Sequence, residues 1–188
     1  MITDLFDQNT AKILTLFSIS PGSKFLRNEL KEKTKLNNWT LDGSLLMLLK
    51  NKILLKEKRL ISLNLSSPSA NETIKLIKRE HARFKELPLE IYFPLMDASY
   101  LLSGLSVLSS VYLFGSYAKL IYTNKSDIDL AVISAKLDKA AKSRLLSRMS
   151  VIEKKYGKNL ELHFFEQKDM QQKDPIIKEI KTNSITLF

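Results

Sequence analysis

Two apolar runs in the second half of the 188-residue chain constrain its fold more than any other feature. Residues 111–114 read Val-Tyr-Leu-Phe and end at Gly115-Ser116, whereas residues 130–133 follow directly on Asp127-Ile128-Asp129. Short runs rich in β-branched and aromatic side chains are typical of buried strands. The sequence therefore predicts a sheet with one inner strand that ends in a small turn and another that begins with two acids.

Residues 98–118 carry no charge, and this window of 21 residues is long enough to cross a bilayer. It contains six serines and two glycines, however, and its second half is β-rich. A buried helix that leads into a buried strand fits this pattern better than a membrane span. Residues 1–4 show no sign of a secretory signal, so we expect a cytoplasmic protein without membrane contact.

The composition limits the chemistry that the chain can perform. Hydrophobic residues make up 44% and charged residues 27%, as in ordinary globular proteins. The absence of cysteine excludes disulfides, a thiolate nucleophile and Cys-ligated metal sites. With only two histidines, a site built from several imidazoles is not expected, and a metal site would have to rely on carboxylates.

The net charge of +10 is concentrated in the first half of the chain. Residues 1–86 contain 16 Lys and Arg against 9 Asp and Glu, a net charge of +7, whereas residues 87–188 contain 14 against 11, a net charge of +3. Such an excess suggests a polyanionic partner for the first half, although it also serves solubility.

The first 66 residues predict three short helices followed by a β-hairpin. Asn37 and Asn38 can cap the third helix, and Ser66 to Ser69 mark a boundary before a connecting helix that ends at Pro88. The expected helices are 9–18, 24–35 and the segment from Asn38 through Leu41, Leu45 and Leu48; the strands are 53–55 and 60–65, with a charged tip at 56–59; the connecting helix spans 67–87.

This order of elements resembles a winged helix-turn-helix domain, with Lys52 where that family usually has a glycine before the wing. The outward positions of the third helix, including Trp39 and Leu46, carry no cation that could read bases. DNA contacts would then be salt-sensitive phosphate contacts. The apolar positions equally suit a protein partner or a homodimer. The candidate DNA contacts are Arg27, Lys31, Lys50, Lys56, Lys58 and Arg59.

The chemistry is expected around the two acids. On a strand, Asp127 and Asp129 would project to the same face, where paired carboxylates can hold Mg²⁺ together with substrate phosphates. Two such ions stabilise both the attacking and the leaving oxygen of a phosphoryl displacement. Gly115 would let a phosphate approach the backbone closely, and Ser116 would offer a hydroxyl and an N–H at the start of a helix.

Residues 114–118 (Phe-Gly-Ser-Tyr-Ala) together with residues 126–130 (Ser-Asp-Ile-Asp-Leu) resemble the signature of the polymerase-β-type nucleotidyltransferase superfamily, in particular its minimal branch. The resemblance covers residues 88–188 and implies an α/β (α+β) fold with a mixed central sheet flanked by helices. Fusions to winged helix domains are of a kind seen in archaea. The resemblance implies that Gly115 and Ser116 hold the triphosphate and that Asp127 and Asp129 bind two Mg²⁺.

In that family a third acid on a later strand completes the metal site and helps to deprotonate the acceptor hydroxyl. The strand expected at 159–165, after a helix over 138–156, places Glu161 at this position, where the family more often has Asp. Glu166 is the next candidate. His163 shares a face with Glu161 by alternation, so it either lines the cleft or is structural. Lys119 matches a basic residue of the family, but Leu120 replaces the usual glycine.

The main hypothesis is a nucleotidyltransferase, dependent on Mg²⁺ (or Mn²⁺), that moves a nucleotidyl group from an NTP to a hydroxyl of a protein, an RNA end or a small molecule. One alternative is a DNA-binding transcriptional regulator with an inactive nucleotidyltransferase-like domain that acts as a sensor or dimer interface. Another is a partner-binding protein, one half of a toxin–antitoxin-like pair.

Overall fold

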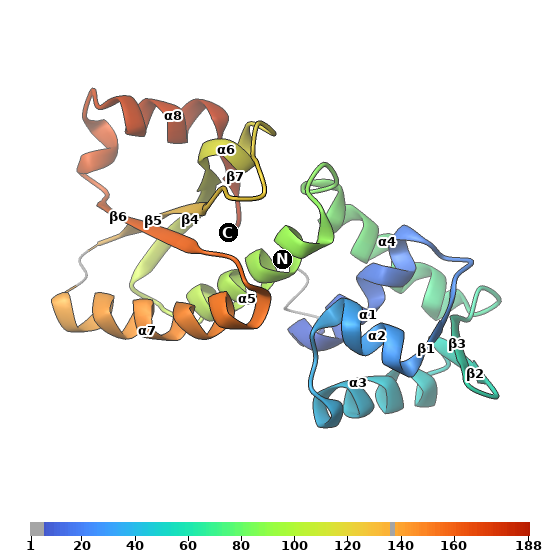
Figure 1. The fold of residues 1–188 in the computed structure, drawn as a ribbon. Helices are drawn as coiled ribbons and strands as arrows, with labels where there is room; N and C mark the ends of the chain where they lie inside the picture. Colours follow the sequence, from blue (N-terminus) through green and yellow to red (C-terminus); the bar gives the residue numbers. More distant parts are fainter. Residues whose placement is uncertain (1–5, 136–137) are drawn as a thin grey trace. The chain divides into compact units, whose positions relative to one another are not determined.

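The computed structural model describes residues 6–135 and 138–188, so the N-terminal residues used to argue against a signal lie outside the described part. The chain divides into two compact units, a first unit of residues 1–85 and a second unit of residues 86–188. Each unit builds its own sheet (Figure 1).

The first unit packs helices against a three-stranded antiparallel sheet with the order β1-β3-β2. Asp7 and Asn37 accept hydrogen bonds from backbone N–H groups at the starts of the first and third helices, which satisfies donors that a helix end leaves free. The elements are α1 (Gln8–Ile19), β1 (Lys24–Leu26), α2 (Arg27–Thr34), α3 (Asn38–Lys50), β2 (Leu54–Glu57), β3 (Leu60–Leu63) and α4 (Pro68–Ala82).

The segment 24–35 is not a single helix, as the sequence pattern suggested. Its first three residues form β1, in which Phe25 pairs with Ile61 of β3 and its ring meets Phe17 of α1 edge to face at 5.2 Å. The helix begins only at Arg27, where the Glu29 carboxylate accepts from the Leu26 N–H at 2.6 Å. The pairing of Phe25 with Ile61, 36 residues away, therefore overrides the local helical pattern.

Helix α4 is part of the first unit rather than a free connector. It starts at Pro68, whose missing N–H costs nothing at the first helical position, and Ser67 caps it. Its buried side chains include Ile74 and Ile77, and it packs mainly on α1. The expectation that residues 67–87 only link two domains is therefore corrected.

The second unit is built on a sheet of four strands with the order β6-β5-β4-β7, and the sheet is mixed, as the resemblance implied. Among the strand pairs that the structure describes in this sheet, β5–β6 is parallel and the others are antiparallel. Figure 1 shows α5 and α7 on one face and α6 and α8 on the other. The elements are α5 (Leu89–Ser103), β4 (Leu108–Phe114), α6 (Gly115–Ala118), β5 (Ile128–Ser134), α7 (Lys139–Tyr156), β6 (Leu160–Glu166), the 3₁₀ helix η2 (Asp169–Gln171), α8 (Pro175–Asn183) and β7 (Ile185–Thr186).

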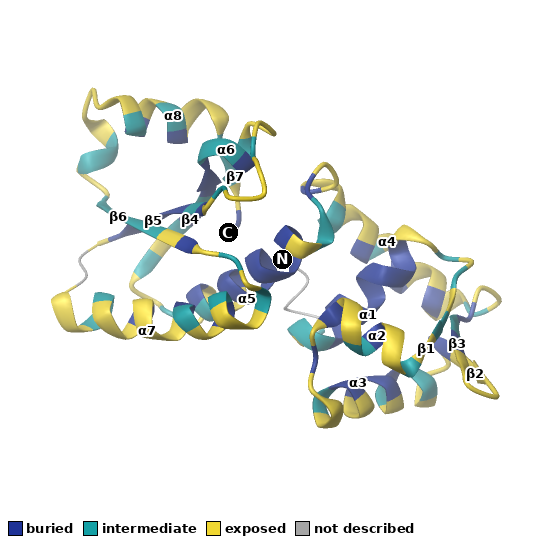
Figure 2. Ribbon diagram, viewed as in Figure 1, coloured by how far each residue is buried: buried dark blue, intermediate teal, exposed yellow. Residues whose placement is uncertain are grey.

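Strand β5 lies inside the sheet, between β4 and β6, and residues 130–134 are buried (Figure 2). The short β7 pairs with Tyr112 and Leu113 and so turns β4 into a second inner strand. The uncharged window at 98–118 contains the end of the largely buried helix α5 and then strand β4, as expected, although Tyr100 and the first half of β4 are more exposed. In the described part of the chain, none of the helices is both long and apolar enough to span a bilayer.

Candidate active site

Three strands of the second unit place two carboxylates side by side. Phe114 at the end of β4 pairs with Asp129 of β5, and Asp129 pairs with Glu161 of β6. Directly paired residues project to the same face of a sheet, so both acids point to the face that carries α8. His163 pairs with Ala131, one step further along the same face.

Gly115 brings the turn after β4 against Asp129. Its φ of +71° lies in the left-handed region that glycine favours, and a Cβ at this position would collide with the Oδ2 atom of Asp129. The sequence predicted that a missing Cβ would make room for a phosphate. In the structure the Asp129 carboxylate occupies that space. The absence of a Cβ at Gly115 therefore allows the turn to lie directly against Asp129.

Asp129, Glu161 and His163 form a cluster that we call the acid–imidazole cluster. One possible ligand atom from each residue lies within 4.8 Å of the others. His163 Nε2 is 3.7 Å from Asp129 Oδ1 and 3.6 Å from Glu161 Oε1. Carboxylate oxygens and imidazole nitrogens are metal ligands, so the cluster has a donor set that fits a divalent cation. Two of the three donors are carboxylates, and the third is a single imidazole.

The acidity of Asp129 reflects its surroundings. Burial raises the pKa of its carboxyl above the usual value, and the charges of Glu161 and Asp127 raise that pKa further, while His163 lowers it. Negative charge thus accumulates at a partly desolvated point. A divalent cation at this point would relieve the repulsion.

Asp127 lies one residue before β5, not on the strand as predicted, and it is exposed. It is not a member of the acid–imidazole cluster. Its loop is anchored nearby, because the Tyr117 hydroxyl donates to the Ser126 carbonyl at 3.4 Å and the Tyr117 ring stacks on Tyr122 at 4.5 Å. The Asp127 charge still acts on the pKa of Asp129, so the two acids lie in the same neighbourhood.

The residues that follow the turn occupy a short loop. Helix α6 has only four residues, and the Ser116 carbonyl accepts from the Ile121 N–H at 3.0 Å. Lys119 forms an ion pair with Glu179 of α8 at 2.8 Å, so its ammonium group is engaged. Leu120 has a φ of +57°. The chain therefore keeps a backbone conformation suited to glycine at the position where the resemblance expects one.

A comparison with known protein families matches the part of the chain that carries this site. Residues 100–188 match the family described as polymerase beta, nucleotidyltransferase. The C-terminal half is a polymerase β-type nucleotidyltransferase domain. The matched residues include the Gly115 turn, both aspartates and the acid–imidazole cluster. No curated protein matches the chain.

Solved structures that resemble part of this chain are described as toxin–antitoxin structures. A crystal structure of MntA–HpeT with a double Asp-to-Glu mutation has 21% identity and a TM-score of 0.38, over 50% of this chain and 72% of that chain. A toxin–antitoxin structure with AMP-PNP has 22% identity and a TM-score of 0.36, over 49% and 71%.

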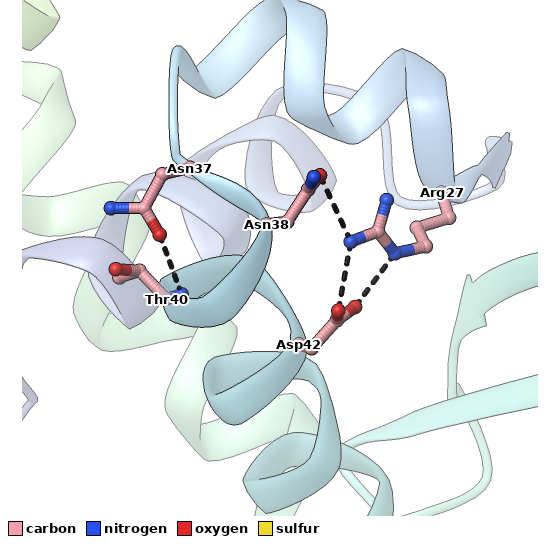
Figure 3. Close-up of polar contacts among 5 residues, drawn as sticks. All are labelled: Arg27, Asn37, Asn38, Thr40 and Asp42. Atoms are coloured by element: carbon pink, nitrogen blue, oxygen red, sulfur yellow. Dashed lines mark hydrogen bonds and ion pairs between the residues drawn. The ribbon is translucent and has the colours of Figure 1, made fainter.

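Outside the nucleotidyltransferase domain, the residues predicted to contact DNA divide into two groups. Arg27 binds Asp42 through two hydrogen bonds, from Nε to Oδ1 at 2.6 Å and from Nη2 to Oδ2 at 2.8 Å, and Nη2 also donates to Asn38 Oδ1 (Figure 3). The hydrogen bond from Arg27 lowers the pKa of the Asp42 carboxyl. The hairpin cations Lys56, Lys58 and Arg59 are exposed; with Arg27 they line a cavity of about 450 Å³.

Lys31 and Lys50, the remaining predicted contacts, do not line this cavity. The outer surface of α3 is apolar, as the sequence indicated, with Trp39 88% exposed and Leu46 69% exposed. These two side chains, with Gly43 and Met47, border a second cavity of about 460 Å³ beside the start of α1. The described surface of α3 therefore offers apolar contact rather than base recognition.

Proposed function

We propose that the protein transfers a nucleotidyl group from an NTP to a hydroxyl acceptor with the help of Mg²⁺ or Mn²⁺. One observation carries this proposal: the Gly115 turn, Asp129 and Glu161 form a continuous row across β4, β5 and β6. A nucleotide's triphosphate and the acids that hold its cations must meet at one point. This row supplies such a point on rigid, paired strands.

Asp129 and Glu161 are the residues that would hold the cation, and Asp127 would approach from the preceding loop. A bound divalent ion neutralises charge on the triphosphate. The acceptor oxygen bonds to the α-phosphorus while the bond to the leaving oxygen breaks and pyrophosphate departs. Glu161 is the more exposed acid of the cluster, so it is the better placed to take the proton of the acceptor hydroxyl.

The Ser116 hydroxyl and N–H lie directly after the turn and would contact the phosphates. Lys119 would assist only after leaving Glu179, since the two form an ion pair. Most of the rate enhancement would then come from positioning and charge neutralisation, as is general for phosphoryl and nucleotidyl transfer.

The test is transfer of label from each NTP, with Mg²⁺ or Mn²⁺, to components of a crude extract. We expect the Asp127→Asn/Asp129→Asn double variant to lose at least about a hundredfold in transfer while remaining folded. Glu166, the second candidate for the third acid, is not in the cluster and pairs with Lys168 at the end of β6, so Glu166→Gln is the matched control. Unchanged transfer by the double variant would contradict the proposal.

We further propose that the first unit is a winged helix-turn-helix module. The order α1-β1-α2-α3-β2-β3 and the β1-β3-β2 sheet support this. Lys56, Lys58 and Arg59 on the hairpin, together with Lys31 and Lys50, would contact phosphates, whereas Arg27 is held by Asp42.

The apolar surface of α3 suits a protein contact, either a partner or a second copy. Sedimentation of Trp39→Ala, compared with that of the unchanged chain, tests this.

A second candidate function is a DNA-binding regulator whose nucleotidyltransferase domain has lost turnover. The engaged Lys119 and the strained Leu120 favour this candidate, since both lie where nucleotide phosphates would approach. A gel shift that weakens steeply with salt, with no transfer of label, would support the regulator. Transfer of label without affinity for DNA would support the enzyme.

A further inference from the structure

We propose that His163 is a nitrogen ligand of the divalent cation in the acid–imidazole cluster, and that the site therefore prefers Mn²⁺ to Mg²⁺. This inference rests on the proposed function, because it concerns the metal that serves the same site. It adds a ligand that differs in kind from the carboxylates predicted from the sequence.

The first observation is the state of the His163 ring. Its Nε2 atom is buried, and among the described residues no group hydrogen-bonds to it. Leaving such an atom without a partner costs about 1–3 kcal/mol. The ring is also fixed, because it lies edge to face on Phe114 at 5.1 Å, and Phe114 belongs to the hydrophobic core under α8. The nitrogen is thus held in place toward the acids.

The second observation is the spacing. The gaps from Nε2 to the oxygens of Asp129 and Glu161, 3.7 Å and 3.6 Å, are too long for good hydrogen bonds, which measure about 2.7–3.2 Å. Bonds from a divalent metal such as zinc to nitrogen and oxygen are about 2.0–2.2 Å long. The summed length of one bond to nitrogen and one to oxygen is therefore greater than either distance between Nε2 and a carboxylate oxygen. An ion can therefore contact Nε2 together with the oxygen of either acid without a rearrangement of the strands.

The third observation is the chemistry of the donor set. Two carboxylates alone suit Mg²⁺, but an imidazole nitrogen shifts preference toward transition metals. Mn²⁺ accepts both donor types. An alternative role for His163 is that of a protonated residue paired with the two acids, in which case it would repel a cation instead of binding one.

The two roles are separated by pulsed electron paramagnetic resonance of bound Mn²⁺, which detects a directly coordinated ¹⁴N nucleus. We expect ¹⁴N modulation from the unchanged protein, loss of that signal in His163→Gln, and its retention in His81→Gln, which removes the chain's other histidine. Calorimetry should show Mn²⁺ binding weakened about tenfold or more in His163→Gln and Mg²⁺ binding changed less.

Circular dichroism melting establishes that each variant is folded. Mn²⁺ binding without ¹⁴N modulation, or modulation that persists in His163→Gln, overturns the inference, and so does Mn²⁺ that binds more tightly to His163→Gln than to the unchanged protein. Label transfer without ¹⁴N modulation defeats this inference and leaves the proposed function intact. Modulation without any transfer defeats the proposed function and supports the metal ligand.

Discussion

The two units arrange their charged side chains in opposite ways. In the first unit, Arg27 and Asp42 are exposed and satisfy each other through two hydrogen bonds. In the second unit, Asp129 and Glu161 stand beside a histidine nitrogen without a hydrogen bond, and burial raises the pKa of the Asp129 carboxyl. Satisfied pairs hold a fold together, whereas a rigid, unsatisfied cluster is a place where a protein can bind a cation.

The second unit also contains a buried, satisfied acid, which provides the strongest test of this contrast. Asp97 of α5 is 6% exposed and accepts hydrogen bonds from Lys155 Nζ at 3.0 Å and from the Tyr156 hydroxyl at 2.8 Å, both at the end of α7. Burial, followed by the charge of Asp97, raises the pKa of the Tyr156 hydroxyl. These three residues join α5 to α7 on the face of the sheet opposite the acid–imidazole cluster.

We expect Asp97→Ala to destabilise the second unit by about 3 kcal/mol, because it removes the buried acceptor that the Lys155 ammonium group and the Tyr156 hydroxyl share. Tyr156→Phe removes one donor and should cost about 1 kcal/mol. Urea unfolding monitored by circular dichroism measures both. Equal losses for the two variants would show that Asp97 does not join the two helices as described.

Gly115→Ala tests whether the turn and the cluster depend on each other. The new Cβ must displace the Asp129 carboxylate and adopt a φ near +71°, so we expect a loss of about 2 kcal/mol and weaker Mn²⁺ binding. Gly157→Ala is the matched control, since Gly157 has a similar φ of +65° but open space around its Cβ position. It should cost about 1 kcal/mol and leave metal binding unchanged.

If the two glycine variants behave alike, the contact between the turn and Asp129 is not important. If only Gly115→Ala binds Mn²⁺ more weakly, metal binding by the acid–imidazole cluster depends on the close contact between the turn and Asp129. The comparison thus separates backbone strain, which the two positions share, from the contact that only one of them makes.

Leu120→Gly compares strain between the two units. Leu120 has a φ of +57° in the second unit, and Lys52 has a φ of +54° in the first; the resemblances expect glycine at both positions. A glycine at a left-handed position lowers the free energy of the folded state by about 1 kcal/mol relative to a residue with a side chain. The greater conformational entropy of glycine in the unfolded chain offsets part of this gain. We expect each glycine variant to raise stability by about 0.5 kcal/mol, measured by thermal melting.

A drop in stability for Leu120→Gly alone would mean that the Leu120 side chain contributes packing that outweighs its strain. The change in stability of Lys52→Gly would then measure backbone strain alone, because the exposed Lys52 side chain contributes little packing. Transfer activity of Leu120→Gly would also report whether the leucine narrows the approach to the Gly115 turn.

Local patterns were sufficient to predict much of the second unit. The apolar runs at 111–114 and 130–133 belong to inner strands, because a continuous apolar run is typical of a strand buried on both faces. The helix expected over 138–156 is present as α7, because its apolar residues recur with helical periodicity. The mixed sheet was expected from the resemblance and is observed. The pairing of Glu161 with Asp129 joins residues 32 positions apart, and no local pattern specifies it.

Other features depend on contacts that no local pattern contains. Strand β1 exists because β3 offers a free edge to residues 24–26, so a helical pattern was overridden. Asp127 precedes β5 because the first paired residue of the strand is Ile128, and alternation alone does not specify where pairing begins. The His163 ring lies edge to face on Phe114, and its Nε2 atom lies 3.7 Å and 3.6 Å from oxygens of the two acids. Only alternation along β6 hinted at its position.

The exposed pair of the first unit should give the smallest effect. The hydrogen bond from Arg27 holds the pKa of the Asp42 carboxyl below its usual value of 3.8. An acid with a lowered folded-state pKa stabilises the fold at neutral pH, and this contribution is lost as pH falls below about 3.8 toward the folded-state pKa. Because both side chains are solvated, Asp42→Asn should shift melting at pH 7 only slightly, and the shift should vanish in acid.

Melting curves at pH 7 and pH 2.5, for Asp42→Asn and the unchanged chain, measure this difference. A loss at pH 7 as large as that of Asp97→Ala would contradict the contrast between an exposed and a buried acid.

The same variant frees Arg27, so its affinity for a DNA duplex at low salt should rise if the cavity lined by Arg27, Lys56, Lys58 and Arg59 contacts phosphates. Unchanged affinity at every salt concentration would show that Asp42 does not mask a phosphate contact of Arg27.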